Sequence, residues 1–242
     1  NDQWSLGAGA GINYGIFSLK RKELTGGESK LDDTDVAPNA KLGVLYEFSS
    51  ATRFGLTYTS KVDYDFEIDA TGNLPQGMLS WSLPIEAAVG SPQQVMFSAV
   101  QVLNSQWSLL ANIGWQDWSS FSETEVSVAG IIRSSRLDLQ DTWHAAVGCQ
   151  YQVSEETRVN FGIAYDSSMY EDQNDTSLFI PTGSAWRFGT GVVHQLNAHS
   201  SLGVAGEYLN MEDARVVSPA VLAGAYDDPQ MFFLAAHYSY QF

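Results

Sequence analysis

Apolar and polar residues alternate with a period of two along almost the whole sequence of 242 residues. In the C-terminal segment Phe232, Leu234 and Ala236 fall on one face of an extended chain, and Phe233 and Ala235 fall on the other. A period of two is that of a β-strand, because successive side chains point to opposite faces. No run approaches the roughly 18 apolar residues of a transmembrane helix. The pattern therefore predicts an all-β protein.

The alternating segments number ten, and an even number of strands suits an antiparallel fold. Residues at odd positions of a strand share one face and residues at even positions share the other, so this parity assigns each residue to a face. A register slip of one residue would exchange the two faces. We expect Tyr58, Val147 and Ile163 on an apolar outer face and Thr57, Gly148 and Gly162 on the inner face. The ten predicted strands are 4–16, 41–48, 53–69, a less regular one within 78–103, 107–116, 143–152, 158–166, 186–196, 201–208 and 231–242.

The connections between these segments alternate in length. Short ones are predicted at 49–52, 103–106, 153–157 and 197–200, and long ones at 20–38, 69–77, 121–140, 168–183 and 212–229. Short periplasmic turns that alternate with long external loops are typical of an up-and-down barrel that crosses a bilayer. We therefore expect an antiparallel up-and-down transmembrane β-barrel with both termini on the periplasmic side.

A soluble β-sandwich is the alternative, because its strands also alternate. Aromatic residues near strand ends, such as Trp107, Trp115 and Trp186, instead match the two aromatic girdles of a membrane barrel. The opposite face is rich in glycine, and the acidic residues between Asp63 and Asp69 make it too polar for a dry core. These two features favour the membrane barrel, and hence the outer membrane of a Gram-negative bacterium.

Charge and cysteine content exclude several functional classes. Lysine and arginine number 12 against 28 acidic residues, which gives a formal net charge of −16. A nucleic-acid-binding surface needs clustered cations, so no nucleic-acid partner is predicted. The single cysteine, Cys149, excludes an internal disulfide and a cysteine-based metal cluster. We predict no cofactor and no metal.

Several segments carry a resemblance to known proteins. The ending Tyr238-Ser239-Tyr240-Gln241-Phe242 resembles the signal by which bacterial outer-membrane proteins are recognised by the barrel assembly machinery. In order and spacing, a further set of segments resembles the FadL/TodX family of outer-membrane channels for long-chain fatty acids and other hydrophobic compounds. These segments are 4–9, 43–48, 53–62, 107–108, 115–121 and 162–168.

The resemblance implies passive transport of long-chain fatty acids or other hydrophobic compounds across the outer membrane. It also implies a fourteen-stranded barrel with an N-terminal hatch, of which residues 1–242 would be the last ten strands. We therefore expect a fragment that forms one transmembrane domain and is a monomer surrounded by lipid and lipopolysaccharide. The stretch 181–185 departs from the family pattern, which puts ligand contacts in that region in doubt.

Two regions are candidates for ligand binding. The family's outer groove is associated with external loops that correspond to 20–38 and 69–77, where the apolar anchors are Leu24, Leu31, Leu74 and Met78. Plain solvated loops explain these segments equally well. Inside the barrel, a fatty acid needs an apolar channel and a cation for its carboxylate. The inward candidates are the polar Arg158, Arg187 and His144 and the apolar Leu209, Met211 and Phe233.

The competing interpretation of the inner arginines is structural. Charges in the lumen of such barrels commonly pair with one another, and Asp166 and Glu207 are predicted on the same face as Arg158 and Arg187. On this interpretation the arginines stabilise the wall and do not bind a ligand.

Three other functions are left open by the sequence. The acidic ladder Asp63, Asp65, Glu67 and Asp69 could hold a divalent cation, although a solvated rim facing lipopolysaccharide accounts for it better. His237 and Ser239 have the spacing of a His-x-Ser pair, as in a lipid-acting hydrolase, but no third group or oxyanion donors accompany them. A structural or adhesin-like barrel is the third alternative. We predict that the chain is not an enzyme.

Overall fold

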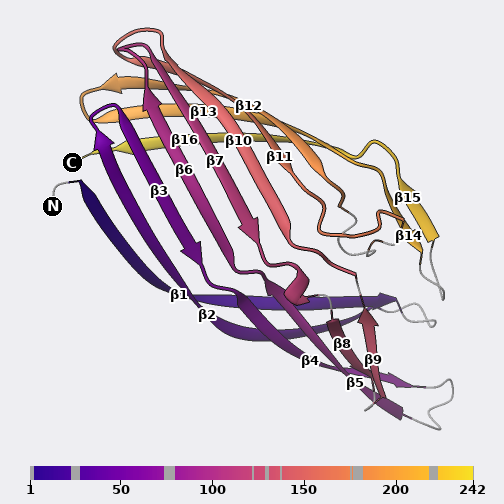
Figure 1. The fold of residues 1–242 in the computed structure, drawn as a ribbon. Coiled ribbons are helices and arrows are strands. Elements are labelled where there is room, and N and C mark those ends of the chain that lie inside the picture. The colour runs from indigo at the N-terminus through magenta and orange to yellow at the C-terminus, as the bar shows by residue number, and fades with distance from the viewer. Residues whose placement is uncertain are drawn as a thin grey trace.

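The computed structural model of the chain describes residues 3–22, 28–73, 80–121, 123–128, 131–136, 138–174, 176, 182–217 and 223–241. Its main element is a curled ten-stranded antiparallel sheet in the order β1-β2-β3-β6-β7-β10-β11-β12-β13-β16 (Figure 1). Within the described part, no helix is long and apolar enough to cross a membrane. The all-β class and the ten antiparallel strands are thereby confirmed.

Strands of the large sheet are joined in chain order, as in an up-and-down meander. Their bounds are β1 Trp4–Lys22, β2 Glu28–Ser49, β3 Thr52–Thr59, β6 Gln94–Val102, β7 Trp107–Gln116, β10 Thr142–Gln152, β11 Thr157–Asp166, β12 Ala185–Asn197, β13 Ser200–Met211 and β16 Gln230–Tyr240. Cross-strand pairs such as Val147–Ile163 and Gly148–Gly162 confirm that the parity assignment groups these residues correctly.

The four predicted short turns lie at one end of the sheet and connect β2–β3, β6–β7, β10–β11 and β12–β13. Both chain ends lie at the same end (Figure 1). There the backbone N–H of Glu47 donates to the carbonyl of Gln3 at 2.8 Å, and that of Gln241 donates to the carbonyl of His199 at 2.8 Å. The expectation that the termini share the short-turn end is confirmed.

The long connection predicted at 20–38 is wrong for most of its length. β1 and β2 remain paired out to Lys22 and Glu28, so a long hairpin replaces the loop. The acidic residues of this stretch predict a loop, but the paired strands accommodate them: Asp32 is exposed, and the half-buried Asp33 and Asp35 accept hydrogen bonds from the backbone N–H groups of Glu67 and Asp65. Pro38 is also tolerated, although it has no backbone N–H to donate. Pro38 and Ala40 have the same parity, so their backbone nitrogens point to the same side of β2. The N–H of Ala40 donates to the Ser60 hydroxyl, on the side away from β1.

The predicted strand 53–69 is also wrong, because it breaks at Ser60 and Lys61. After the break, β4 (Val62–Asn73) leaves the large sheet and begins a four-stranded sheet in the order β4-β5-β8-β9. The irregular strand predicted within 78–103 is two strands, β5 and β6. The smaller elements are β5 Ser80–Ser91, a 3-10 turn at Ser119–Phe121, β8 Glu123–Val128, β9 Ile131–Arg136, β14 Ala214–Val217 and β15 Ala223–Tyr226.

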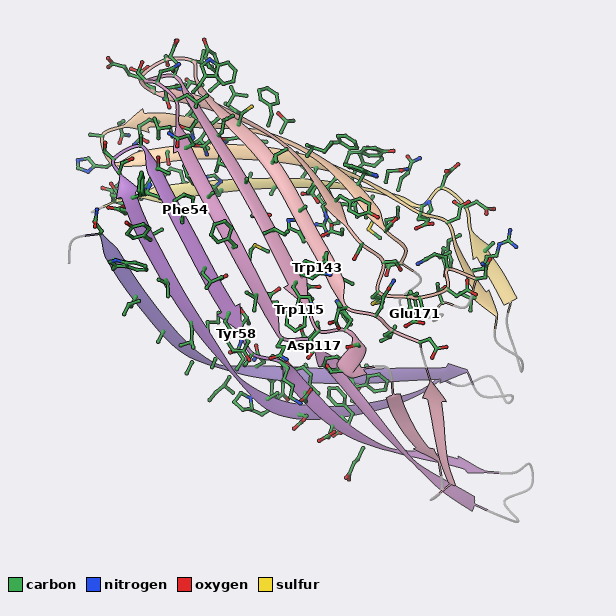
Figure 2. The ribbon with its side chains drawn as sticks, in the orientation of Figure 1. Phe54, Tyr58, Trp115, Asp117, Trp143 and Glu171 are labelled. Carbon is green, nitrogen blue, oxygen red and sulfur yellow. The ribbon has the colours of Figure 1, made fainter. Side chains whose placement is uncertain are left out.

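Apolar side chains of the large sheet are exposed, whereas the buried residues form small clusters near the long connections. Leu6 is 80% exposed, Val147 60% and Leu234 83%. An apolar face of this size is stable where lipid covers it. Aromatic pairs lie at both ends of the strands. At the short-turn end, the rings of Trp107 and Tyr151 contact each other in a tilted arrangement with centroids 4.6 Å apart. Near the other end, Trp115 pairs in register with Trp143 (Figure 2).

Candidate functional site

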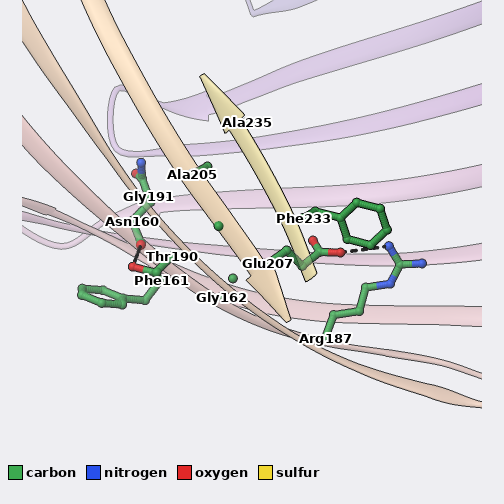
Figure 3. Close-up of a pocket in the computed structure, with 12 residues that line it drawn as sticks. Asn160, Phe161, Gly162, Arg187, Thr190, Gly191, Ala205, Glu207, Phe233 and Ala235 are labelled. Atoms are coloured by element: carbon green, nitrogen blue, oxygen red, sulfur yellow. Dashed lines mark hydrogen bonds and ion pairs between the residues drawn. The ribbon is translucent and has the colours of Figure 1, made fainter. Parts of the chain in front are cut away.

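A hollow of about 640 Å³ lies on the face of the sheet that carries Gly162 and Gly189, here called the glycine-rich face. It spans β11, β12, β13 and β16 (Figure 3). The hollow exists because small residues meet across the strands, with Gly162 opposite Gly189, and Ala205 opposite both Gly191 and Ala235. At Gly189 an added Cβ would meet nothing within 4 Å. Four neighbouring strands thus leave an open space that side chains do not fill.

A second hollow of about 340 Å³ continues along the same face onto β7 and β10. Both hollows share Asn160, Gly162, Arg187, Gly189 and Glu207 in their walls. The two spaces are therefore neighbouring parts of one concave surface that extends over six strands.

Charged and ionisable residues from four strands meet beside these hollows, and three of them, His144, Arg187 and Glu207, line the walls. On β12, Arg187 donates from Nε to Oδ2 of Asp166 on β11 at 2.5 Å. Its other nitrogen, Nη1, lies 3.5 Å from Oε1 of Glu207 on β13. On β10, Nδ1 of His144 lies 2.6 Å from Oδ1 of Asp166. We call these four residues the ion-pair cluster.

The register of the strands builds the ion-pair cluster. His144 is directly opposite Asp166, and Arg187 is diagonal to Asp166 and to Glu207. Side chains at such positions are within reach of one another across a sheet. The predicted pairing of Arg187 with Asp166 and Glu207, which gives Arg187 a structural role in the wall, is confirmed.

Apolar residues border the ion-pair cluster on two sides. Phe233 of β16 lies opposite Glu207 and beside the guanidinium of Arg187 (Figure 3). Leu209 lies opposite Arg187, and together with Met211 and Ala185 it forms a buried cluster toward the long connections. The predicted residues His144, Arg187, Leu209, Met211 and Phe233 therefore occupy one continuous region.

Arg158 is the predicted residue that lies elsewhere. It is exposed at the short-turn end of β11, opposite Gln152 and Val193. Among the described residues it forms no ion pair. Sequence parity could place Arg158 on the same face as Arg187. It could not show that the two residues lie at different positions along the length of their strands. Asn160, which lines both hollows, was not singled out from the sequence, although it shares the parity of Arg158.

Only one of the predicted outer-loop anchors falls within the described residues. Leu24, Leu74 and Met78 lie outside the described residues, and Leu31 is part of β2, opposite Leu19. A ligand groove at these positions therefore stays a prediction.

The acidic ladder has partners of its own. Asp63 forms an ion pair with Lys61 at 2.8 Å. The backbone N–H groups of Asp65 and Glu67 donate to carboxylates of β2. In the part of the chain that the structure describes, no group of three or more His, Cys, Asp or Glu is placed to hold a metal ion.

His237 and Ser239 lie on β16, opposite Gly203 and Ser201. The ring of His237 occupies the space above Gly203 that a Cβ would need. The imidazole thus packs on the neighbouring strand, and the pair has no described third member.

Comparison with known proteins identifies a family. The sequence profile described as "Outer membrane protein transport protein (OMPP1/FadL/TodX)" matches residues 1–242. The long-chain fatty acid transport protein of Salmonella typhi is 24% identical over 251 residues, which cover 89% of this chain and 58% of that protein. The chain thus spans little more than half the length of this curated relative.

Solved structures agree on the fold. A FadL homologue of Pseudomonas aeruginosa matches with a TM-score of 0.75 at 20% identity, covering 99% of this chain and 65% of that one. The toluene transporter TodX of Pseudomonas putida matches with a TM-score of 0.67 at 15% identity, covering 100% and 66%. The ten-stranded sheet therefore has the fold of the barrel wall in these proteins.

Proposed function

Because the chain belongs to the outer membrane protein transport family of OMPP1, FadL and TodX, we propose that it serves passive transport of hydrophobic compounds across the outer membrane. Long-chain fatty acids and aromatic hydrocarbons are the two solute classes that the names of its relatives indicate. The observation that supports this proposal best is the hollow on the glycine-rich face. Away from Arg187 and Glu207, the part of the surface lined by Gly162, Gly189, Gly191 and Ala205 is smooth and presents few polar side chains to a solute.

We assign the lumen to the glycine-rich face and the lipid contact to the opposite face. Gly148 and Gly162 then face the lumen, and Val147 and Ile163 face lipid. The proposed ligand contacts are Phe233, Leu209 and Met211 for the apolar part of a solute, with Arg187 and His144 at its polar end. Arg158 stands apart from this set and would act, if at all, near the short-turn end.

The remaining proposals concern the surroundings of the barrel. Residues 1–242 act as one transmembrane domain, as a monomer, in contact with lipid and lipopolysaccharide. Phe242, the last residue of the proposed assembly-machinery signal, lies outside the described residues. We propose no catalytic activity, because His237 packs on Gly203 and lacks an orienting partner among the described residues. A lipid-hydrolysis assay that detects activity lost in His237→Ala would overturn this.

The test of transport is to fill the hollow. Gly189→Phe places a ring into open space on the glycine-rich face, so it should fold normally and obstruct the path. Uptake of labelled toluene and oleate is measured in a Gram-negative host that lacks its own long-chain fatty acid transport protein. We expect uptake with the original chain and a fall of about fivefold or more with Gly189→Phe, because the ring fills space in the hollow that the solute would otherwise occupy.

Gly55→Phe is the matched control. Gly55 lies on β3 on the same face, an added Cβ there also meets nothing within 4 Å, and it does not line either hollow. Uptake should be retained in this variant. If the original chain gives no uptake of either solute above the empty host, the transport proposal is wrong.

A further inference from the structure

We propose that the hollow prefers uncharged hydrophobic solutes that carry a hydroxyl group over hydrophobic solutes that carry a carboxylate. This inference rests on the proposed transport function and names the solute class for the same site. It follows from the charges in the wall, which differ from what a fatty-acid carboxylate requires.

The first step is the charge balance of the ion-pair cluster. Two carboxylates, Asp166 and Glu207, surround one guanidinium, that of Arg187. His144 also bonds Asp166, so it adds a partner to the carboxylate and no free cation. With a neutral imidazole the cluster carries a net charge of −1, and with a protonated one it is neutral. Neither state attracts an anion.

The second step is the geometry of Arg187. Its Nε donates to Asp166 at 2.5 Å, and its Nη1 faces Glu207 at 3.5 Å. A carboxylate ligand at this guanidinium would become the third carboxylate around it. Repulsion among like charges increases when water is displaced by apolar groups such as Phe233, because the local dielectric constant falls. An anionic head group would therefore have to displace Glu207 or stay in water.

The third step is the capacity to accept hydrogen bonds. Glu207 has, among the described residues, only the long contact with Arg187, and its side chain is 37% exposed. An ionised carboxylate accepts up to about four hydrogen bonds and donates none. A solute hydroxyl can donate to Glu207 without a charge of its own, while its apolar part lies on Phe233, Ala205 and Ala235. The wall thus offers acceptors and an apolar surface together.

Equilibrium binding of octan-1-ol and octanoate at about pH 7.5, where octanoate is ionised, tests the inference. Both ligands have the same chain length, so the head group is the only difference. Binding is measured by calorimetry on the full 242-residue chain folded in detergent, and uptake of both ligands is measured in the host described above. We expect octan-1-ol to bind about tenfold more tightly, which corresponds to about 1.4 kcal/mol.

Glu207→Gln removes one of the competing carboxylates and keeps the shape of the side chain. It should raise the affinity for octanoate about tenfold and so remove the preference. Asp166→Asn is the second variant and should act in the same direction, which protects the test against misfolding of one variant. Glu156→Gln is the matched control: Glu156 is exposed in the β10–β11 turn and bonds only Ser154 through its side chain among the described residues.

Two outcomes separate this inference from the transport proposal. If octanoate binds as tightly as octan-1-ol, or if the ratio stays unchanged in both folded variants, the inference is overturned while transport stands. If neither ligand binds and neither is taken up, the transport proposal itself fails. A preference for octan-1-ol that is lost in Glu207→Gln and kept in Glu156→Gln supports the inference.

Discussion

The imidazole of His237 covers Gly203 across the β13–β16 pair. A Cβ atom built on Gly203 would lie 2.6 Å from Nδ1 and 2.7 Å from Nε2 of that ring. The two residues are directly opposite each other in the register, so the contact is a cross-strand pair in which a ring shields a glycine. His237 is also the histidine of the His-x-Ser pair for which the sequence left a catalytic role open, and here its ring makes a structural contact.

Gly203→Ala should therefore destabilise the β13–β16 pair. The added methyl group forces the ring of His237 off the strand, at a cost of about 1 kcal/mol, which is typical of overpacking. In the background of His237→Ala the same substitution should cost almost nothing, because the obstructing ring is gone. Urea unfolding in lipid vesicles, followed by tryptophan fluorescence, measures all four members of this double-mutant cycle.

Gly90→Ala is the contrasting substitution. There the Cβ would meet the ring of Phe121, which can move, and would also lie 2.7 Å from the backbone oxygen of Val62, which cannot rotate away. This variant should lose more stability than Gly203→Ala, and removal of the Phe121 side chain should restore it only in part, because the contact with the Val62 oxygen remains. Equal costs for the two alanine variants, or no rescue of Gly203→Ala by His237→Ala, would contradict the packing described for His237.

The stability of the long-connection end should depend on the charge of Asp141. This residue precedes β10, and its carboxylate accepts hydrogen bonds from Nε1 of Trp115 at 2.9 Å and from the N–H of Ser119 at 3.2 Å. Partial burial is the largest single influence and raises the pKa of Asp141. The hydrogen bonds from Ser119 and Trp115 together outweigh it and leave the pKa below its usual 3.8.

A lowered pKa means that the fold favours the charged carboxylate. The stabilisation is complete above the unfolded-state pKa of 3.8 and is lost as the pH falls through the lower folded-state value. Asp141→Asn should therefore be less stable than the original chain at about pH 7, and the difference should shrink as the pH falls through the folded-state pKa of Asp141. Unfolding midpoints at a series of pH values measure this.

Asp172→Asn provides the control for Asp141. Its pKa is also lowered, by hydrogen bonds from the backbone and side chain of Asn174, but this contact is local and exposed. Its replacement should change the unfolding midpoint at about pH 7 less than Asp141→Asn does, because a contact between residues two apart can also form in the unfolded chain. A difference between Asp141→Asn and the original chain that persists unchanged at low pH would show that the charge of Asp141 is not the cause.

The ten strands could be predicted from alternation alone, because one face of a barrel wall is apolar and the other is polar or glycine-rich. Successive residues of a strand therefore differ in polarity. Two errors have physical reasons. Tyr58 and Val62 share a parity, so the break at Ser60 and Lys61 leaves no trace in the pattern. The β1–β2 extension was missed because its residues Asp32, Asp33 and Asp35 have the composition of a loop, and the sequence does not show that the backbone of β4 donates hydrogen bonds to Asp33 and Asp35.

The sequence could predict which face of the sheet carries the site residues, but not how far along the strands each of them lies. Parity places Arg158, Arg187 and Glu207 on one face, and this assignment agrees with the structure. Which of these residues meet depends on the register between neighbouring strands, which is set by the lengths of the connections. Register brings Asp166 to Arg187 and leaves Arg158 at the short-turn end.

Arg187 should be coupled more strongly to Asp166 than to Glu207. The first pair is separated by 2.5 Å and the second by 3.5 Å, and Arg187 is 42% exposed, which allows solvent to screen both. Double-mutant cycles with Arg187→Met, Asp166→Asn and Glu207→Gln should give coupling energies of about 1 kcal/mol and below about 0.5 kcal/mol. Stronger coupling to Glu207 would show that the guanidinium is oriented differently.

The last prediction concerns the contact between the two sheets. Strand β4 is not paired with β2, yet two carboxylates of β2 accept hydrogen bonds from its backbone. Oδ2 of Asp35 accepts from the N–H of Asp65 at 2.9 Å, and Oδ2 of Asp33 accepts from that of Glu67 at 2.7 Å. These bonds satisfy backbone donors that a neighbouring strand would otherwise have to satisfy, so they protect the free edge of β4.

The double variant Asp33→Ala/Asp35→Ala should therefore expose the amides of Asp65 and Glu67. A hydrogen bond to a charged acceptor contributes about 1.5 kcal/mol or more, so amide exchange at these two positions should accelerate about tenfold or more. Asn at both positions keeps an acceptor oxygen and should restore most of the protection. Asp63→Ala is the control, because the side chain of Asp63 pairs with the exposed Lys61. If exchange at Asp65 and Glu67 is unchanged in the double alanine variant, β4 is held against β2 by packing, and the carboxylates contribute nothing measurable to it.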